Sequence, residues 1–145
     1  MKLKGSIKIG VAAVLAVGSF ALSAPTASAA PNPGTCSGQD FCLYYNSNFQ
    51  GATFEDGRGS SQASENYGAP NWYTFSGGNG AGVNVKNNAA SAWNFNFNFS
   101  VTVYYNSNSS GPNQYIKRLT GANFNDQLKN NNASQCLDAF QPCPS

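Results

Sequence analysis

The sequence contains no histidine, and only 10% of its 145 residues are charged. Without histidine, neither a Ser-His-Asp or Cys-His catalytic relay nor a histidine-ligated zinc site can be built. The scarcity of charge excludes a basic surface for nucleic acid and an acidic tail. The chain is nevertheless 41% hydrophobic and 13% aromatic, which is enough for one packed core.

The first 29 residues predict a secretory signal peptide. Three lysines within the first eight residues precede an uncharged apolar run over 9–22, and the small-x-small site Ala27-Ser28-Ala29 follows it. The run is short for a membrane span and no second run follows, so a retained anchor is the less favoured alternative. We therefore expect an extracellular protein whose mature chain, residues 30–145, has five basic and six acidic residues.

All four cysteines, Cys36, Cys42, Cys136 and Cys143, lie in this mature part. An even number of cysteines in an exported chain predicts two disulfides. Of the three connectivities, we favour the local one, Cys36–Cys42 with Cys136–Cys143. The crossed pairings, which would tie the N-terminus to the C-terminus, remain open.

Alternating patterns predict β-strands. Apolar and polar residues alternate over 41–45 and 101–105, and four aromatics alternate with Asn94, Asn96 and Asn98 over 93–99. In this last strand we expect the aromatics to face the core and the asparagines to face solvent. Twenty asparagines and many glycines and serines disfavour helix, for which 123–128 is the one candidate. The fold class is therefore all-β, with two packed antiparallel sheets.

An internal repeat divides the mature chain into two units. Segment 43–48 (Leu-Tyr-Tyr-Asn-Ser-Asn) recurs 60 residues later as 103–108 (Val-Tyr-Tyr-Asn-Ser-Asn). Segment 86–91 (Lys-Asn-Asn-Ala-Ala-Ser) recurs 43 residues later as 129–134 (Lys-Asn-Asn-Asn-Ala-Ser). The first unit has about 17 extra residues within 55–82. Two ordered matches predict a duplicated β-unit, and hence two Greek keys, about 40–99 and about 100–138, in one domain over 30–145.

The segment Tyr45 to Gly51 resembles the first hairpin of a βγ-crystallin motif, in which an aromatic residue precedes a folded turn closed by glycine. The early cysteine pair followed by Leu-Tyr-Tyr-Asn-Ser, together with Lys-Asn-Asn-Ala-Ala-Ser-x-Trp ending at Trp93, resembles peptidase inhibitor family I36. The resemblance covers roughly 36–136. It implies a disulfide-braced sandwich that inhibits secreted proteases, with zinc metalloproteases the best-known target class and serine proteases as an alternative. We expect a monomer that is not an enzyme.

The inhibitory loop has two candidate locations. The first is the loop closed by the last two cysteines, whose residues are Leu137, Asp138, Ala139 and Phe140. The alternative there is a disulfide that only holds the chain end. The second is the extra segment over 55–82, which contains Trp72, Tyr73 and Phe75. The alternative there, which we favour, is that 72–75 is a core strand.

The resemblance also implies a rival chemistry, because calcium-binding βγ-crystallins use loops of the pattern Asn/Asp-Asn/Asp-x-x-Ser/Thr-Ser. Segments 87–92 and 130–135 match it except at the last position, where Ala92 and Gln135 stand. The predicted ligands are Asn46, Asn87, Asn88, Ser91, Asn106, Asn130, Asn131 and Ser134. All are neutral, so we expect weak Ca²⁺ binding, with dissociation constants of about 10⁻⁴ M or poorer. The alternative is that these residues only build turns.

Two other function classes are less well supported. A glycosidase needs two facing carboxylates, but adjacent Glu55 and Asp56 would point to opposite faces of a strand. A carbohydrate-binding module would need the aromatics of 93–99 to be exposed as a stacking surface, which the expected core placement disfavours.

Overall fold

The computed structural model describes residues 36, 38–56, 64–70, 72–139 and 143–145. The predicted signal peptide therefore lies outside the described residues. These described residues form eight strands: β1 (Phe41–Asn46), β2 (Gln50–Asp56), β3 (Ser64–Asn66), β4 (Ser91–Asn94), β5 (Val101–Asn106), β6 (Ser110–Ile116), β7 (Thr120–Asn123) and β8 (Ser134–Leu137). No helix occurs within these described ranges, so none there is long and apolar enough to cross a membrane.

The one helix candidate, over 123–128, does not form a helix, as the all-β prediction requires. A turn takes its place, in which Asn125 Oδ1 accepts the Leu128 N–H at 3.0 Å and the Asn125 carbonyl accepts the Lys129 N–H at 2.9 Å. Asparagine satisfies backbone donors from its own side chain, and this competes with helix formation.

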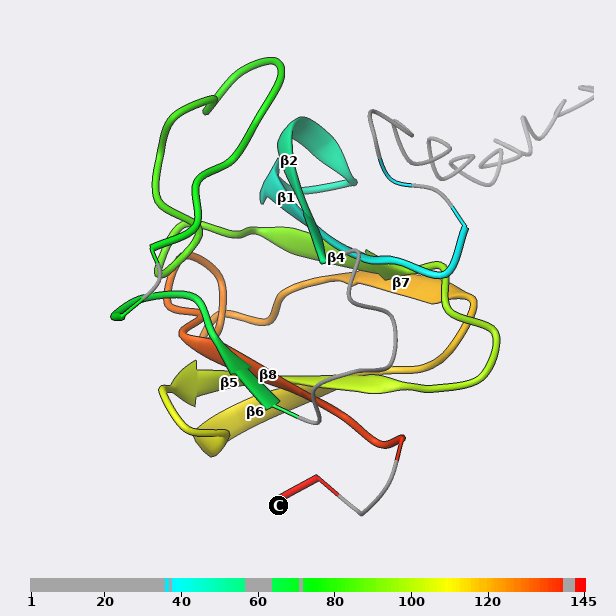
Figure 1. Ribbon diagram of the computed structural model, residues 1–145. Coiled ribbons are helices and arrows are strands. Elements are labelled where there is room, and N and C mark those ends of the chain that lie inside the picture. The colour runs from blue at the N-terminus through cyan, green and yellow to red at the C-terminus, as the bar shows by residue number, and fades with distance from the viewer. Residues whose placement is uncertain (1–35, 37, 57–63, 71, 140–142) are drawn as a thin grey trace, which may run out of the picture.

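The strands form two four-stranded sheets, sheet A with the order β2-β1-β4-β7 and sheet B with the order β6-β5-β8-β3. All neighbouring strands are antiparallel. The sheets lie one above the other, as Figure 1 shows. Each sheet takes three strands from one repeat unit and one from the other, so the two predicted Greek keys interlock in a single sandwich.

The repeat seen in the sequence is a repeat of backbone conformation. Both hairpins, β1–β2 and β5–β6, have a register shift at the same place, between Tyr44 and Asn46 and between Tyr104 and Asn106. The residues with positive φ also come in matched pairs: Asn48 and Asn108, Phe49 and Ser109, Gly51 and Gly111, and Asn87 and Asn130. The folded turn is therefore specified twice by the same short sequence.

The hydrophobic core lies between the sheets and follows the predicted alternation. Phe41 and Leu43 of β1 face Val101 and Val103 of β5 within one buried cluster. Full burial of each such side chain stabilises the fold by roughly 1.5–3 kcal/mol.

Each outer face of the sandwich is covered by a disulfide from a chain end. Cys36–Cys42 packs with Tyr44 and Phe49 over sheet A. Cys136–Cys143 lies over sheet B. The favoured local pairing is thus confirmed.

The expected orientation of 93–99 is wrong. β4 ends at Asn94, and Asn94 and Asn96 are buried while Phe97 is 53% exposed. The buried amides are satisfied, because Asn94 Nδ2 donates to the Phe99 carbonyl at 3.0 Å and Asn96 Oδ1 accepts the Phe99 N–H at 2.9 Å. Trp93 is half-buried outside sheet A. The aromatics therefore form neither a core stripe nor a continuous exposed ribbon for sugars.

The extra segment of the first unit is only partly a core element. Phe75 is buried, but Trp72 is 57% exposed, so 72–75 is not the core strand we expected. Single bridges replace a strand: Thr53 pairs with Ser76, and Thr74 pairs with Asn84. Trp72 instead lies near Lys86, whose Nζ is 6.0 Å from the ring centroid.

Candidate functional site

A glycine-rich loop over 76–82 projects from the first unit. It rises beside the β1–β2 hairpin, at the upper left of Figure 1. Its sequence, Ser-Gly-Gly-Asn-Gly-Ala-Gly, has no charge, and every residue except the half-buried Gly80 is exposed. Its glycines at 77, 78, 80 and 82 all have positive φ, between 68° and 97°, which explains why glycine is needed there.

Main-chain hydrogen bonds hold this loop at its base and in its middle. Thr53 and Ser76 exchange two bonds of 2.9 Å, and the Phe75 carbonyl accepts the Gly82 N–H at 2.9 Å. The Asn79 carbonyl accepts the Ala52 N–H at 2.7 Å. The loop is therefore a rigid extension of the edge of sheet A.

The close approach of Gly80 to Tyr45 fixes the loop further. A Cβ added at Gly80 would lie 2.3 Å from Cγ of the Tyr45 ring, so a side chain there would push the loop away. Asn46 Nδ2 also donates to Asn79 Oδ1 at 3.3 Å. Side-chain contacts thus pin the middle of the loop to the first hairpin.

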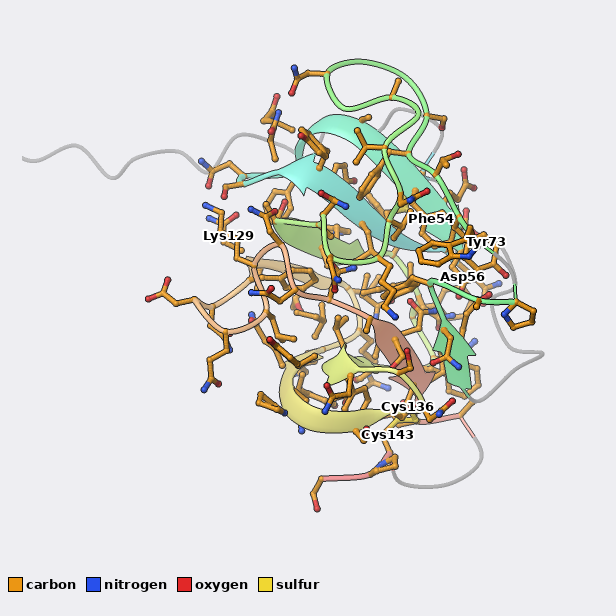
Figure 2. The ribbon with its side chains drawn as sticks, turned by 90° about the vertical axis from the view of Figure 1, so that its left-hand side faces the viewer. Phe54, Asp56, Tyr73, Lys129, Cys136 and Cys143 are labelled. Atoms are coloured by element: carbon orange, nitrogen blue, oxygen red, sulfur yellow. A yellow bond between two sulfur atoms is a disulfide. The ribbon has the colours of Figure 1, made fainter. Side chains whose placement is uncertain are left out.

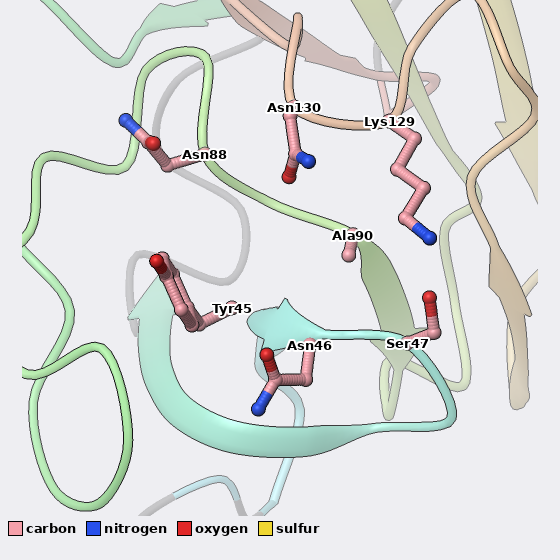
Figure 3. Close-up of a pocket in the computed structure, with 7 residues that line it drawn as sticks. All are labelled: Tyr45, Asn46, Ser47, Asn88, Ala90, Lys129 and Asn130. Carbon is pink, nitrogen blue, oxygen red and sulfur yellow. The ribbon is translucent and has the colours of Figure 1, made fainter.

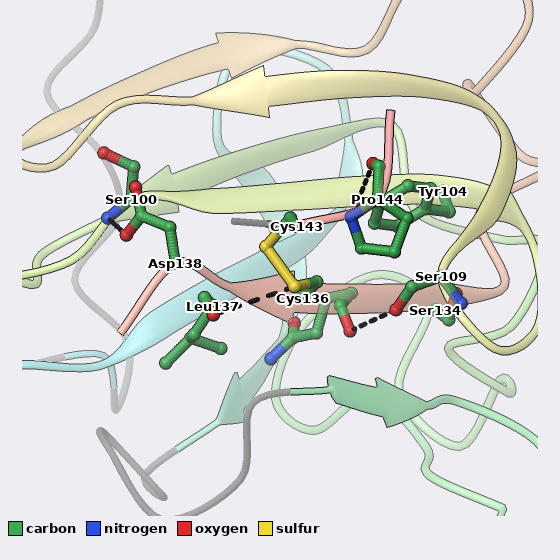
Figure 4. Close-up of a disulfide and its surroundings, with 10 residues drawn as sticks. Ser100, Tyr104, Ser109, Ser134, Cys136, Leu137, Asp138, Cys143 and Pro144 are labelled. Atoms are coloured by element: carbon green, nitrogen blue, oxygen red, sulfur yellow. Dashed lines mark hydrogen bonds between the residues drawn. A yellow bond between two sulfur atoms is a disulfide. The ribbon is translucent and has the colours of Figure 1, made fainter. Parts of the chain in front are cut away.

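The second candidate loop is held differently. Leu137 belongs to β8 and is buried, and Asp138 Oδ1 accepts the Ser100 N–H at 2.7 Å (Figure 4). Ala139 packs against the core, and Phe140 lies outside the described residues. The described residues of this loop therefore contact the body of the domain and hold the C-terminal segment against it. Tyr104 adds to this, since its hydroxyl donates to the Pro144 carbonyl at 2.5 Å.

A cavity of about 400 Å³ lies where the first hairpin meets the second Asn-Asn loop. Its lining residues are Tyr45, Asn46, Ser47, Asn88, Ala90, Lys129 and Asn130 (Figure 3). It brings together three of the predicted calcium ligands, Asn46, Asn88 and Asn130. Lys129 is the only charged residue among those lining it, and its ammonium points toward Ser47 in Figure 3.

The serines predicted as calcium ligands hold the hairpins. Ser91 Oγ donates to the Asn46 carbonyl at 2.7 Å and accepts the Phe49 N–H at 3.0 Å. Ser134 repeats this in the second unit, with a donation to the Asn106 carbonyl at 2.6 Å. The two serine hydroxyls and the two hairpin carbonyls are thus bonded to each other.

Some of the remaining predicted ligands also make hydrogen bonds within their own loops. Asn88 Nδ2 donates to the Lys86 carbonyl at 3.0 Å, and Asn131 Nδ2 donates to the Lys129 carbonyl at 3.3 Å. Asn87, like its counterpart in the other loop, is exposed on left-handed backbone. Within the described ranges, no three His, Cys, Asp or Glu side chains gather into a metal-binding group. An ammonium without carboxylates fits Ca²⁺ poorly, and calcium binding stays a prediction.

A buried polar network that the sequence does not reveal links the two sheets. Gln135 of β8 donates from Nε2 to Asp56 of β2, and its Oε1 accepts the Tyr67 hydroxyl at 2.7 Å. Burial, and then the negative charges of Asp56 and Glu65, raise the pKa of Tyr67 well above its ordinary value. The ring centroid of Phe54 lies 6.1 Å from that of Tyr67 and 5.1 Å from that of Tyr73. Phe54 and Tyr73 lie close to Asp56 in Figure 2. The network is enclosed by aromatic rings and lies apart from the cavity residues, which indicates a structural role.

Comparison with known proteins places these features in a family. The model of peptidase inhibitor family I36 matches residues 29–116. A solved structure described as "Evolution of the eye lens beta-gamma-crystallin domain fold" aligns with a TM-score of 0.50 at 13% identity, covering 71% of this chain and 88% of that chain. The N-terminal domain of Protein S aligns with a TM-score of 0.48 at 16% identity, covering 71% of this chain and 99% of that chain. No curated protein matches the sequence significantly. The fold is that of a βγ-crystallin domain.

Proposed function

Because the chain belongs to peptidase inhibitor family I36, we propose that it inhibits an extracellular protease by placing the loop over 76–82 in the active-site cleft. An inhibitor of this kind needs no catalytic residue, and the protein is not an enzyme. Two disulfides suit a protein that works outside the cell.

The observation that supports this loop is its rigidity combined with its exposure. Binding a flexible segment costs ordering entropy, and a loop already held in shape avoids much of that cost. Three main-chain contacts, from Ala52, Thr53 and Phe75, hold the loop in the free protein. In the C-terminal loop, by contrast, the described side chains Leu137 and Asp138 already have partners inside the domain.

The composition of the loop favours a zinc metalloprotease as the target. A catalytic zinc keeps one coordination position open, and it polarises a substrate carbonyl bound there. The carbonyls of Gly78, Asn79 and Gly80 already accept hydrogen bonds inside the protein, from Ala81, Ala52 and Val83. The group offered to the zinc is therefore the carbonyl of Gly77, which the glycines at 77 and 78 leave uncovered by side chains, so that it can closely approach the floor of a narrow cleft. The absence of charge in the loop also lowers the cost of desolvating it.

The test is a titration of the protein against a thermolysin-type zinc protease and a subtilisin-type serine protease. We expect stoichiometric inhibition of the zinc protease. Gly80→Ala should raise the inhibition constant about tenfold or more, because the new Cβ displaces the loop from Tyr45. Gly38→Ala is the matched control: Gly38 also has positive φ, but a Cβ there meets nothing within 4 Å.

Two results would contradict the proposal. Failure to inhibit either protease at micromolar protein would exclude inhibition of these targets. Full inhibition by Gly80→Ala, with inhibition lost in the double variant Cys136→Ser/Cys143→Ser, would move the inhibitory segment to the C-terminal loop.

A further inference from the structure

The two repeat units differ in what covers their edge strands. β2 is the last strand of sheet A, yet its outer side is occupied by a segment of the same chain. Thr53 of β2 exchanges two main-chain hydrogen bonds with Ser76 in an antiparallel bridge. Next to this bridge, the ring of Phe75 packs on Tyr45 with centroids 5.8 Å apart. An extended segment with an aromatic residue thus closes this edge.

Among the described residues, no segment pairs its main chain with the equivalent edge of the second unit, which β6 forms. The Gln114 side chain does bond to the neighbouring segment, with Nε2 donating to the Asn123 carbonyl and Oε1 accepting the Asn125 N–H, but these bonds leave the main chain of β6 unpaired on its outer side. Position 113 corresponds to Thr53 at the repeat offset of 60, and Asn113 makes no main-chain bond to a described segment other than β5. The same is true of Tyr115, which is 58% exposed. The residues from Ser110 to Asn113 are all exposed as well.

The register shows which main-chain N–H and C=O groups of β6 point away from β5. Tyr44 pairs with Thr53 in the first hairpin, and Tyr104 pairs with Asn113 at the equivalent position of the second hairpin. Since Thr53 directs its N–H and C=O away from β1, Asn113 directs its own away from β5. Tyr115 lies two residues further and shares this direction. Pro112 stands where Ala52 offers an N–H, so the open edge is limited to 113–115.

A side-chain platform accompanies this open edge. Tyr105 corresponds to Tyr45, but it is 42% exposed because the second unit lacks the extra segment that brings Phe75 onto Tyr45. The second unit therefore has an unpaired backbone edge at Asn113 and an exposed aromatic ring at Tyr105. It lacks the segment that pairs with the edge and packs on the ring in the first unit.

We propose that the β6 edge binds an extended segment of a partner polypeptide. The segment pairs antiparallel with Asn113, and an aromatic residue just before the pairing residue packs on Tyr105, as Phe75 packs on Tyr45. Strand addition of this kind takes its affinity from main-chain hydrogen bonds and its selectivity from the neighbouring side chain. This surface belongs to the second unit and is separate from the loop over 76–82, so it goes beyond the proposed inhibition.

The test uses the chain's own covering segment as the probe. A capped peptide Trp-Tyr-Thr-Phe-Ser-Gly, the sequence of 72–77, is titrated into ¹⁵N-labelled protein with both disulfides formed. We expect amide shift changes centred on Asn113 and Tyr115. A peptide with alanine in place of phenylalanine should bind at least about fivefold more weakly, since it loses the aromatic contact.

Variants separate strand pairing from other modes of binding. Asn113→Pro removes the outward N–H and should abolish the shifts, whereas Asn113→Ala should keep them. Tyr105→Ala changes an exposed side chain and should weaken binding at least about fivefold while leaving protease inhibition unchanged. If Asn113→Pro does not fold, the Tyr105→Ala variant still tests the proposal.

Three outcomes would overturn the proposal: shifts that avoid β6, equal binding of the alanine peptide, or full binding by both Asn113→Pro and Tyr105→Ala. Shifts at β6 that grow with protein concentration in the absence of peptide would show that a second copy of the chain fills the edge instead.

Discussion

Lys86 of the first unit donates a hydrogen bond from Nζ to Ser107 Oγ of the second unit, at 3.4 Å. Its counterpart 43 residues later, Lys129, lines the cavity beside Ser47 of the first unit. Each Asn-Asn loop therefore places an ammonium against the hairpin of the other unit. This is where the sequence predicts Ca²⁺, and an ammonium a few ångströms away repels a divalent cation.

The first prediction concerns calcium. We expect 5 mM Ca²⁺ to change the Tm of the wild-type protein by less than about 1 °C, because the two ammonium groups oppose the cation and keep the dissociation constant above about 10 mM. A dissociation constant of about 10⁻⁴ M would instead raise the Tm by several degrees, since 5 mM Ca²⁺ would then stabilise the fold by about 2 kcal/mol. The double variant Lys86→Ala/Lys129→Ala removes both ammonium groups and should respond more to Ca²⁺. Thermal scans with Ca²⁺, Mg²⁺ and chelator measure this, and Lys117→Ala, an exposed lysine outside both loops, is the control. A saturable Ca²⁺-dependent rise in the wild-type Tm would instead establish the calcium sites.

The second prediction concerns Asn132, a fully buried side chain that joins the two units. Its Oδ1 accepts the Ala89 N–H at 2.9 Å, and its Nδ2 donates to the Val85 carbonyl at 3.0 Å. Asn132→Ala leaves both groups unpaired and should lower the free energy of unfolding by about 2–4 kcal/mol. Urea denaturation at neutral pH measures the loss.

Asn131→Ala is the matched control, since the Asn131 side chain is half-buried and bonds only to its own loop. It should cost under about 1 kcal/mol. Equal losses for the two variants would show that Asn132 does not link the units.

The fold could be predicted from the sequence wherever the signal is local or repeated. The alternation that places Leu43 and Val103 in the core lies within single strands, and the repeat reports that two units share one conformation. The pairing of the cysteines could also be predicted, because the two cysteines of each disulfide are only six or seven residues apart in the sequence.

The misplaced residues depend on contacts from distant parts of the chain. The alternating pattern predicts that Asn94 lies on the surface. Its side-chain amide is instead buried, because Nδ2 donates hydrogen bonds to the carbonyls of Phe99 and Ile116. The role of Ser91 is similar: only the folded hairpin shows that its hydroxyl bonds the Asn46 carbonyl rather than standing free as a ligand.

The candidate site is harder still to predict, because it lies between elements that are far apart in sequence. The cavity joins Ser47 to Lys129, and the loop over 76–82 owes its shape to Tyr45 and Ala52. No local pattern encodes such pairings. The internal repeat is the one signal that could have suggested that each loop reaches the opposite hairpin.

The third prediction compares two buried tyrosines. The hydroxyl of Tyr44 is buried and has no hydrogen-bond partner in the described structure, whereas that of Tyr67 donates to Gln135. Tyr44→Phe should therefore be neutral or stabilise the protein by up to about 1 kcal/mol, and Tyr67→Phe should destabilise it by about 1–3 kcal/mol. Urea denaturation of both variants measures the contrast. Destabilisation by Tyr44→Phe as large as that by Tyr67→Phe would contradict it.

The fourth prediction is a loss of stability in alkali. Burial raises the pKa of Tyr44 to about 12, and burial together with the negative charges of Asp56 and Glu65 raises the pKa of Tyr67 well above its ordinary value. The unfolded chain releases these protons near pH 10, while the folded chain keeps them. The contribution of these tyrosines to stability is therefore constant below about pH 10 and falls above it, because the unfolded state then binds fewer protons.

The size of this fall can be assigned by variants. Each buried tyrosine contributes a slope of up to about 1.4 kcal/mol per pH unit between its unfolded and folded pKa values. Tyr44→Phe removes one such group and should make the decline between about pH 10 and 12 shallower. The exposed Tyr115→Phe is the control and should keep the wild-type slope. Urea denaturation at half-unit steps from pH 9 measures both. An unchanged slope in Tyr44→Phe would show that the alkaline loss comes from other groups.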